Sequence, residues 1–136
     1  MIVNPAYAYM GKQEPEPDFT FWNSDGSLNV SLGECVNVTY ESWVPRLQVN
    51  GNGYAQFTIN ASKYRKIKFN AAANMKYTLS VCAIENGIEY GTESYNLNTS
   101  KIDFEFVIPK EFQKNNATFK FYSGPQFWLY SIILTN

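Results

Sequence analysis

Hydrophobic and polar residues alternate along most of the chain from Ser27 onward, and this alternation predicts β-strands. The clearest case is residues 101–109, KIDFEFVIP, where every second residue from Ile102 to Ile108 is apolar. Charged residues fill most of the positions between them, and a proline ends the segment. A period of two residues is typical of a strand with one face in a core and the other in water.

Seven further segments show the same pattern: 35–40, 44–49, 54–59, 64–69, 75–84, 117–122 and 127–134. Turn sequences separate them. Asn50-Gly51-Asn52-Gly53 is expected to divide two strands, Asn86-Gly87 to form a tight hairpin, and Ser123-Gly124-Pro125 to form a sharp turn. Short strands with short connections predict an all-β sandwich or barrel. The abundant apolar faces favour an antiparallel two-sheet β-sandwich of the jelly-roll type.

Residues 1–27 differ from the rest of the chain. Pro5, Pro15 and Pro17 interrupt any helix or strand ladder there. We therefore expect an extended N-terminal arm over residues 1–27 and a sandwich domain over residues 28–136. The aromatic residues of the arm would dock on this domain or on a partner subunit.

Composition narrows the possible functions. The chain has 136 residues, of which 45% are hydrophobic and 17% aromatic, with a net charge of -1 and no histidine. This content predicts one folded domain and excludes a disordered chain. Near-zero charge argues against nucleic-acid binding, and no run of about 20 apolar residues predicts a membrane span. The absence of histidine removes Ser-His and Cys-His catalysis and most transition-metal sites.

The two cysteines, Cys35 and Cys82, lie in alternating segments and belong to no metal-binding motif. We interpret them as two small buried thiols. A disulfide between them stays open, because sequence does not supply the required geometry.

The last 20 residues, ATFKFYSGPQFWLYSIILTN, resemble the closing hairpin of galactose-binding-like jelly rolls, a group that includes many carbohydrate-binding modules. The segment YAQFTINASKYRKIKFNA and the following MKYTLSVCAIENG are similar to the strands and links of the same group. The resemblance covers residues 28–136 and implies carbohydrate binding. Similar small jelly rolls occur in bacteriophage virion proteins that bind host cell-wall sugars or decorate particles.

This resemblance implies a non-catalytic carbohydrate-binding module, an accessory adhesion protein of a phage particle that recognises glycans of the host cell surface. The first residues show neither the basic nor the apolar region of a secretory signal, so we expect a protein that is kept inside a cell or leaves it by a route that needs no signal, such as the release of virus particles by lysis. The likeness to phage jelly rolls implies synthesis in the host cytoplasm and a place in the virion. The alternative is a virion structural or decoration protein, whose arm contacts another protein subunit. No cofactor is expected. Structural calcium is common in such jelly rolls, and Asp25 beside Asn23 and Ser24 is the only weak candidate here.

Candidate ligand-binding residues follow from the chemistry of sugars. An aromatic ring covers the C–H groups of a sugar ring, while amide and charged side chains bind its hydroxyls. With Phe119 and Phe121 in the core, Tyr122 points outward, and Tyr54 and Gln56 do so by the same alternation. The predicted carbohydrate-binding residues are Trp43, Arg46, Gln48, Tyr54, Gln56, Tyr95, Tyr122 and Trp128. The competing interpretation is that these aromatic residues are core or sheet covering.

A pair of carboxylates offers the one enzymatic alternative. Asp103 and Glu105 share the outer face of a strand, roughly 6–7 Å apart by strand rise, which overlaps the separations in glycosidases. Such pairs are also common on solvated strand faces. We expect a protein without catalytic activity.

Overall fold

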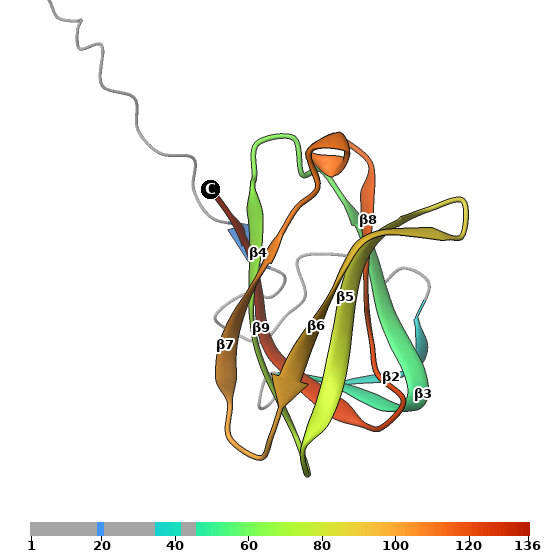
Figure 1. Cartoon of the computed structure of the whole chain (residues 1–136), viewed down its shortest axis with the longest axis vertical. Coiled ribbons are helices and arrows are strands. Elements are labelled where there is room, and N and C mark those ends of the chain that lie inside the picture. The colour runs from blue at the N-terminus through green and yellow to red at the C-terminus, as the bar shows by residue number, and fades with distance from the viewer. Residues whose placement is uncertain (1–18, 21–34, 42–45) are drawn as a thin grey trace, which may run out of the picture.

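The computed structural model describes residues 19–20, 35–41 and 46–136, which form an antiparallel β-sandwich (Figure 1). Its elements are β1 (Phe19–Thr20), β2 (Val36–Glu41), β3 (Arg46–Ile59), β4 (Lys66–Ala73), β5 (Tyr77–Glu85), β6 (Ile88–Leu97), β7 (Ile102–Val107), the 3-10 turn η1 (Lys110–Phe112), β8 (Ala117–Tyr122) and β9 (Phe127–Thr135). The described part of the chain contains no α-helix. The expected all-β jelly-roll class is confirmed.

The strands follow the order β6-β5-β8-β3-β9-β4-β7, with every pair antiparallel. This continuous ladder folds over on itself, so that β6, β5, β8 and the second half of β3 face β9, β4 and β7 across the core (Figure 1). Six phenylalanines are almost fully buried between the two layers: Phe57, Phe69, Phe106, Phe119, Phe121 and Phe127. Their burial follows the period-two pattern of the sequence.

The two layers are connected by a corner in β3. Residues 46–49 of β3 pair with β2 and β9, whereas residues 54–59 pair with β8. The link 123–126 between β8 and β9 lies beside this corner, and the backbone N–H of Asn52 donates a 2.7 Å hydrogen bond to the carbonyl of Gly124. The bend of β3 and the link between β8 and β9 therefore lie side by side where the chain passes from one layer to the other.

Backbone requirements explain why Asn and Gly occupy the corner. Asn37 and Asn52 both have positive φ angles, of 55° and 60°, a region that Asn tolerates better than most residues. A Cβ atom on Gly53 would lie 2.9 Å from the carbonyl oxygen of Asn50 and still closer to that of Val36. Only glycine fits there without moving backbone, because real Cβ atoms do not approach carbonyl oxygens so closely.

Two sequence expectations are therefore corrected. Asn50-Gly51-Asn52-Gly53 does not separate two strands, since residues 46–59 form the single bent strand β3. The last 20 residues are also not a hairpin, because β8 and β9 both pair with β3 and continue one another along it. A Gly-containing bulge and a hairpin turn have the same composition, and only long-range pairing distinguishes them.

The polar strand β6 is a feature that the alternation pattern does not single out. Almost all of its residues are exposed, and it pairs with β5 through the Asn86-Gly87 turn. Glu85 and Ile88 are the last pair of the ladder, so the expected tight hairpin is confirmed. Only Tyr95 and Leu97, near the C-terminal end of β6, face the core, which explains why its pattern differs from that of the other strands.

Several sequence predictions lie outside the described residues. The arm is described only at Phe19 and Thr20, which pair with Ile133 and Leu134 of β9. Trp43 and the calcium candidate Asp25 fall in undescribed segments. The division into an arm and a domain stays a prediction. Within the described ranges, no helix is long and apolar enough to cross a membrane.

Both cysteines have free thiols. Cys82 on β5 is fully buried, as expected, whereas Cys35 is half-buried, and its thiol contacts the carbonyl of Gln56 at 3.9 Å. Strands β3 and β8 separate the two positions, since Cys82 pairs with Lys120 and Lys120 pairs with Gln56. Neighbouring strands lie about 4.8 Å apart, so the two thiols are too distant for a disulfide.

Candidate functional site

The corner in β3 divides the predicted binding residues into two groups. Tyr54, Gln56 and Tyr122 lie on the outer face of the β3–β8–β5–β6 sheet, together with Lys120 and Glu89. We call these five residues the tyrosine face. Arg46, Gln48 and Trp128 lie beyond the corner, on the outer face of β3 and β9. With Tyr130 they form the tryptophan face.

Strand pairing positions the tyrosine face. Tyr54 is opposite Tyr122 and Gln56 is opposite Lys120, so the four side chains form a two-by-two array. The Lys120 ammonium lies 4.5 Å from the centre of the Tyr54 ring and 4.8 Å from that of the Tyr122 ring. An ammonium at these distances is attracted to the negative faces of both rings. Lys120 thus holds the two tyrosines in a fixed relation.

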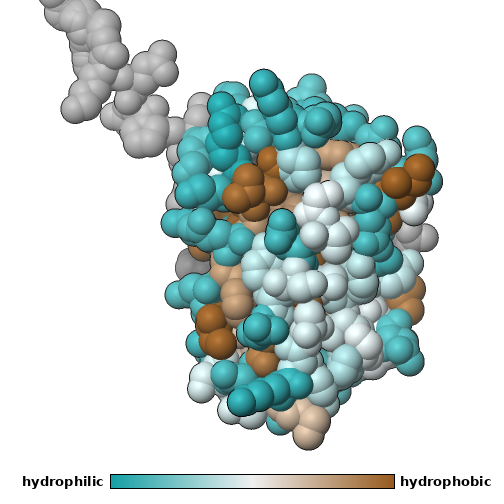
Figure 2. All heavy atoms as spheres, in the orientation of Figure 1, coloured by the Kyte–Doolittle hydropathy of each residue, from teal (hydrophilic) through white to brown (hydrophobic). Residues whose placement is uncertain are grey.

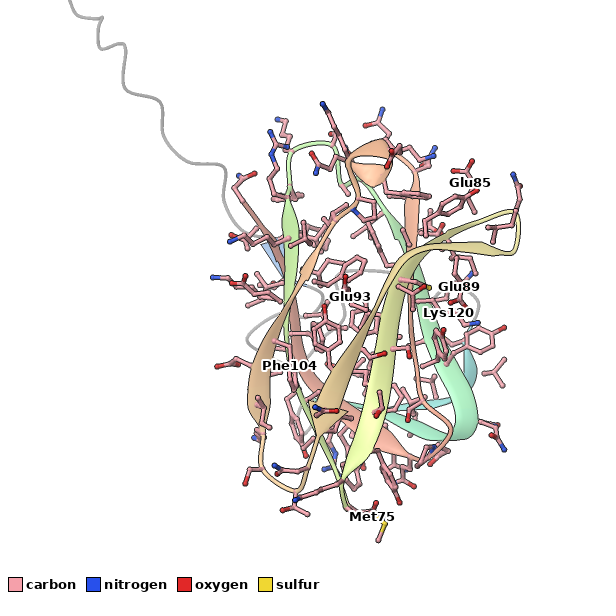
Figure 3. The ribbon with its side chains drawn as sticks, in the orientation of Figure 1. Met75, Glu85, Glu89, Glu93, Phe104 and Lys120 are labelled. Atoms are coloured by element: carbon pink, nitrogen blue, oxygen red, sulfur yellow. The ribbon has the colours of Figure 1, made fainter. Side chains whose placement is uncertain are left out.

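Glu89 from β6 completes this arrangement. The Tyr122 hydroxyl donates a 2.7 Å hydrogen bond to Glu89 Oε1, which also accepts a 3.2 Å bond from Thr92. Burial, together with the hydrogen bond and charge of Glu89, raises the pKa of Tyr122 to about 12. The phenol is therefore neutral, and it donates to the carboxylate at physiological pH. In Figure 3, Glu89 and Lys120 lie close together beside β5 and β8.

Sequence reasoning missed Lys120 and Glu89. Lys120 alternates with Phe119 and Phe121, so its outward position was readable from the pattern. Glu89 follows the Asn86-Gly87 turn, and such a turn requires a second strand that folds back on the first. This was the available signal for a polar side chain from β6 on the same face.

Cys82 lies beneath these polar groups, fully buried. Burial, followed by the charge of Glu89, raises the pKa of this thiol to about 11. A thiol with a raised pKa stays protonated and unreactive, because the thiolate is the reactive form. The tyrosine face is therefore suited to binding through rings, amides and charges.

A polar pocket of about 260 Å³ continues the tyrosine face toward the β5–β6 hairpin. Gln56 and Thr118 line it from the sheet, and Asn86, Glu85 and Asn116 line it from the hairpin and the link before β8. From Tyr54 to Thr58 the strand rises by about 13 Å. The tyrosine face and this pocket together form a surface that is longer than one sugar ring.

The tryptophan face has similar residue types but uses them differently. Trp128 Nε1 donates a 2.9 Å hydrogen bond to Gln48, and the Arg46 guanidinium lies 5.1 Å from the Trp128 ring centre. Arg46 also forms an ion pair with Glu41 and donates a 3.1 Å bond to the Tyr130 hydroxyl. These groups bond to one another, so fewer of them are available to a ligand.

Tyr95 belongs to neither face. Its ring packs edge-on against Phe69 and Phe104, at centre-to-centre distances of 5.1 and 5.3 Å. Its hydroxyl donates a 2.8 Å bond to the carbonyl of Glu105 in β7. Tyr95 thereby connects β6 to β7 at the open side of the sandwich, away from the outward position that the sequence suggested.

The carboxylates of β7 have ordinary partners. Asp103 accepts a 2.8 Å hydrogen bond from Asn70, and Glu105 forms a 3.6 Å ion pair with Lys66. A pocket of about 380 Å³ lies beside them. In the described ranges no cluster of three or more Cys, Asp or Glu side chains is arranged to hold a metal ion. We assign no catalytic role to this face.

No family profile and no curated protein sequence matches the chain. Solved structures do match its fold. A substituted carbohydrate-binding module of family 29 superposes with a TM-score of 0.63 at 10% identity, over 88% of this chain and 91% of the module. CsCBM6-3 from Clostridium stercorarium, in complex with cellobiose, gives 0.56 at 8% identity, over 78% and 88%.

A family two carbohydrate esterase from Cellvibrio japonicus also matches, with a TM-score of 0.58 at 10% identity. The match covers 88% of this chain but only 33% of the esterase. At such low identities, what these structures share with the chain is the β-sandwich jelly-roll fold.

Proposed function

We propose that the protein is a non-catalytic carbohydrate-binding module and that the tyrosine face is its binding surface. The observation that carries this proposal is the paired array of Tyr54 and Tyr122 around Lys120, beside the carboxylate of Glu89. The rings offer apolar faces for sugar C–H groups, and the charged and amide groups around them offer donors and acceptors for hydroxyls.

Lys120 forms no ion pair with a described residue, a property that it shares with Lys101, whose ammonium lies 4.2 Å from the Tyr130 ring centre. The ion pairs between described residues involve Arg46, Lys66 and Lys114, and none involves Lys120. Its ammonium has three donors and meets only the two ring faces there. A sugar hydroxyl placed over the array would supply an acceptor for these donors.

The exposed apolar residues give a protein partner less support. Figure 2 shows scattered brown patches among polar and pale surface on the visible side, where no continuous apolar area appears. The exposed large apolar side chains of the described residues are spread over the fold, and only two of the five, Ile88 and Tyr90, share a strand: Val36, Met75, Ile88, Tyr90 and Val107. Apolar residues scattered singly are normal on protein surfaces, whereas docking surfaces are contiguous.

Calorimetric titration tests this proposal. The probes are mannohexaose and cellulohexaose, which are bound in structures of the similar family 29 module, and purified bacterial cell-wall polysaccharide. We expect a dissociation constant of about 1 mM or tighter for at least one glycan, and a loss of roughly thirtyfold in Tyr54→Ala and in Tyr122→Ala.

Tyr130→Ala is the matched control, because Tyr130 is also a half-buried tyrosine near a cation but lies on the tryptophan face. Its glycan affinity should equal that of the unsubstituted protein. Absence of binding to every probe at about millimolar concentration would refute the proposal. Equal losses in all three variants would move the site away from the tyrosine face.

The particle context is a separate part of the proposal. We propose that the module is an accessory adhesion protein of a phage virion and that residues 1–27 anchor it to another virion subunit. Support comes from the sequence alone, through the proline-interrupted arm and the likeness to phage jelly rolls. Deleting residues 1–27 should abolish incorporation into particles while glycan affinity is kept. Incorporation that survives the deletion would refute the anchoring role.

A further inference from the structure

The chain contains three Asn-Gly pairs, at residues 50–51, 52–53 and 86–87. In any such pair the backbone nitrogen of glycine can attack the Cγ atom of asparagine. The new N–Cγ bond closes a five-membered imide as the side-chain nitrogen leaves as ammonia. Water then opens the imide to aspartate or isoaspartate, so the overall reaction replaces an amide by a carboxylate and needs only water. Because the three pairs have the same sequence, their local structure decides which of them reacts.

The corner restrains its two Asn-Gly pairs. Asn50 Nδ2 donates a 3.1 Å bond to the carbonyl of Asn37, and its Oδ1 accepts a 2.9 Å bond from Gln48. The backbone of Asn52 is bonded to Gly124, and Gly53 is buried against neighbouring carbonyl oxygens. Attack by either glycine would require these contacts to break.

The Asn86-Gly87 pair of the β5–β6 hairpin is more exposed than the two pairs of the corner. Asn86 and Gly87 are both exposed and have φ angles of 54° and 75°, as in a type I′ turn. The ladder ends at the Glu85–Ile88 pair, so the Gly87 N–H takes no part in it. A Cβ on Gly87 would meet nothing within 4 Å, which leaves open space around this backbone.

We propose that Asn86 is the deamidation site of the folded protein and that its conversion weakens glycan binding. The second half of this statement rests on the proposed function. Asn86 lines the polar pocket that continues the tyrosine face, together with Glu85 and Gln56. Conversion replaces a donor amide by a second carboxylate beside Glu85, so this pocket loses a hydrogen-bond donor and gains repulsion.

Peptide mapping by mass spectrometry tests the modification on the intact chain. The native protein and the protein in denaturant are incubated in parallel at mildly alkaline pH, and conversion is measured at Asn50, Asn52 and Asn86. We expect comparable rates at all three sites in denaturant, and conversion first and mainly at Asn86 in the native protein. Native rates at Asn50 or Asn52 that match Asn86, or equal protection of all three, would overturn the assignment.

Titration of Asn86→Asp with the best glycan tests the consequence. Asp-Gly favours the same turn, so the hairpin is retained. We expect affinity to fall roughly three- to tenfold. Asn74→Asp is the control, because it adds the same charge at an exposed position between β4 and β5, outside the pocket.

The outcomes of the two experiments are separable. Equal affinities of Asn86→Asp and the unsubstituted protein would overturn the effect on binding. Failure of the unsubstituted protein to bind any glycan would refute the proposed function and, with it, the effect on binding. The mapping experiment reads the modification directly and does not depend on a ligand.

Discussion

The tyrosine face and the tryptophan face have nearly the same ingredients and differ in how those ingredients are used. Each has aromatic rings, a cation over two of them and an amide alongside. On the tryptophan face, Arg46 is bonded to Glu41 and Tyr130, and Trp128 is bonded to Gln48. On the tyrosine face, Lys120 meets rings and leaves its donors available. Aromatic content alone therefore does not identify a binding surface.

The corner that separates the two faces should be the most sensitive point of the comparison. Gly53→Ala places a Cβ against the carbonyls of Val36 and Asn50, and we expect it to lower the free energy of unfolding by about 3 kcal/mol. Gly124→Ala is the control, since its Cβ meets nothing within 4 Å, and a change within about 0.5 kcal/mol is expected. Urea denaturation measures both. Equal stabilities would show that the corner tolerates a side chain.

Trp128→Ala should separate stability from binding. The half-buried indole and its bond to Gln48 are lost, so we expect unfolding to become easier by about 2 kcal/mol. Glycan affinity, measured by calorimetry at a temperature where the variant is folded, should stay unchanged. A large loss of affinity would assign the binding surface to the tryptophan face instead.

Tyr122→Phe tests the role of the Tyr122 hydroxyl separately from that of its ring. The ring remains for contact with the sugar and with Lys120, but the hydroxyl bond to Glu89 is lost. We expect a decrease of about 1 kcal/mol in the free energy of unfolding and a modest loss of affinity, much smaller than in Tyr122→Ala. If the two variants bind equally weakly, the hydroxyl and not the ring carries the interaction.

Alkaline pH should weaken the tyrosine face through Tyr122. Its pKa is about 12 in the folded protein, against 10.0 for an ordinary tyrosine. The unfolded chain loses this proton first, so the folded state binds more protons between these values. The contribution is fully present below pH 10 and is lost as pH rises toward about 12.

Denaturation at several pH values above about 9 checks this. Tyr95 shares the effect, with its pKa raised to about 12 chiefly by burial. Each of Tyr122→Phe and Tyr95→Phe should make the decline shallower, and an unchanged slope in either variant would contradict the assignment to that phenol.

Glu41→Gln should have the smallest effect. It removes the ion pair with Arg46, but both side chains are partly exposed, and such pairs contribute about 0–1 kcal/mol. Arg46 keeps its contacts with Trp128 and Tyr130. We expect urea denaturation to show a small decrease in the free energy of unfolding, and this decrease should disappear in high salt. A loss as large as that of Trp128→Ala would mean that the ion pair organises this face.

Much of the fold was predictable because strands with one buried face show an alternating pattern of apolar and polar residues in the sequence. Phe119 and Phe121 alternate with Thr118, Lys120 and Tyr122, and both phenylalanines are buried as this alternation requires. The outward positions of Tyr54 and Tyr122 follow from the same rule. β6 shows this pattern only near its C-terminal end, where Tyr95 and Leu97 face the core, and its other residues are exposed. Glu89 was missed with it.

Local pattern by itself determined the fold class, most of the core residues and which side chains point out of the predicted strands 54–59 and 117–122, because these depend on a period of two along the chain. It did not determine that β3 bends between the sheets, that β8 and β9 both pair with it, or that Tyr95 turns toward the core. Those features depend on pairings between residues far apart in the chain, and a glycine bulge looks like a turn until its partners are known. The bend alone decides which outward residues meet on one surface.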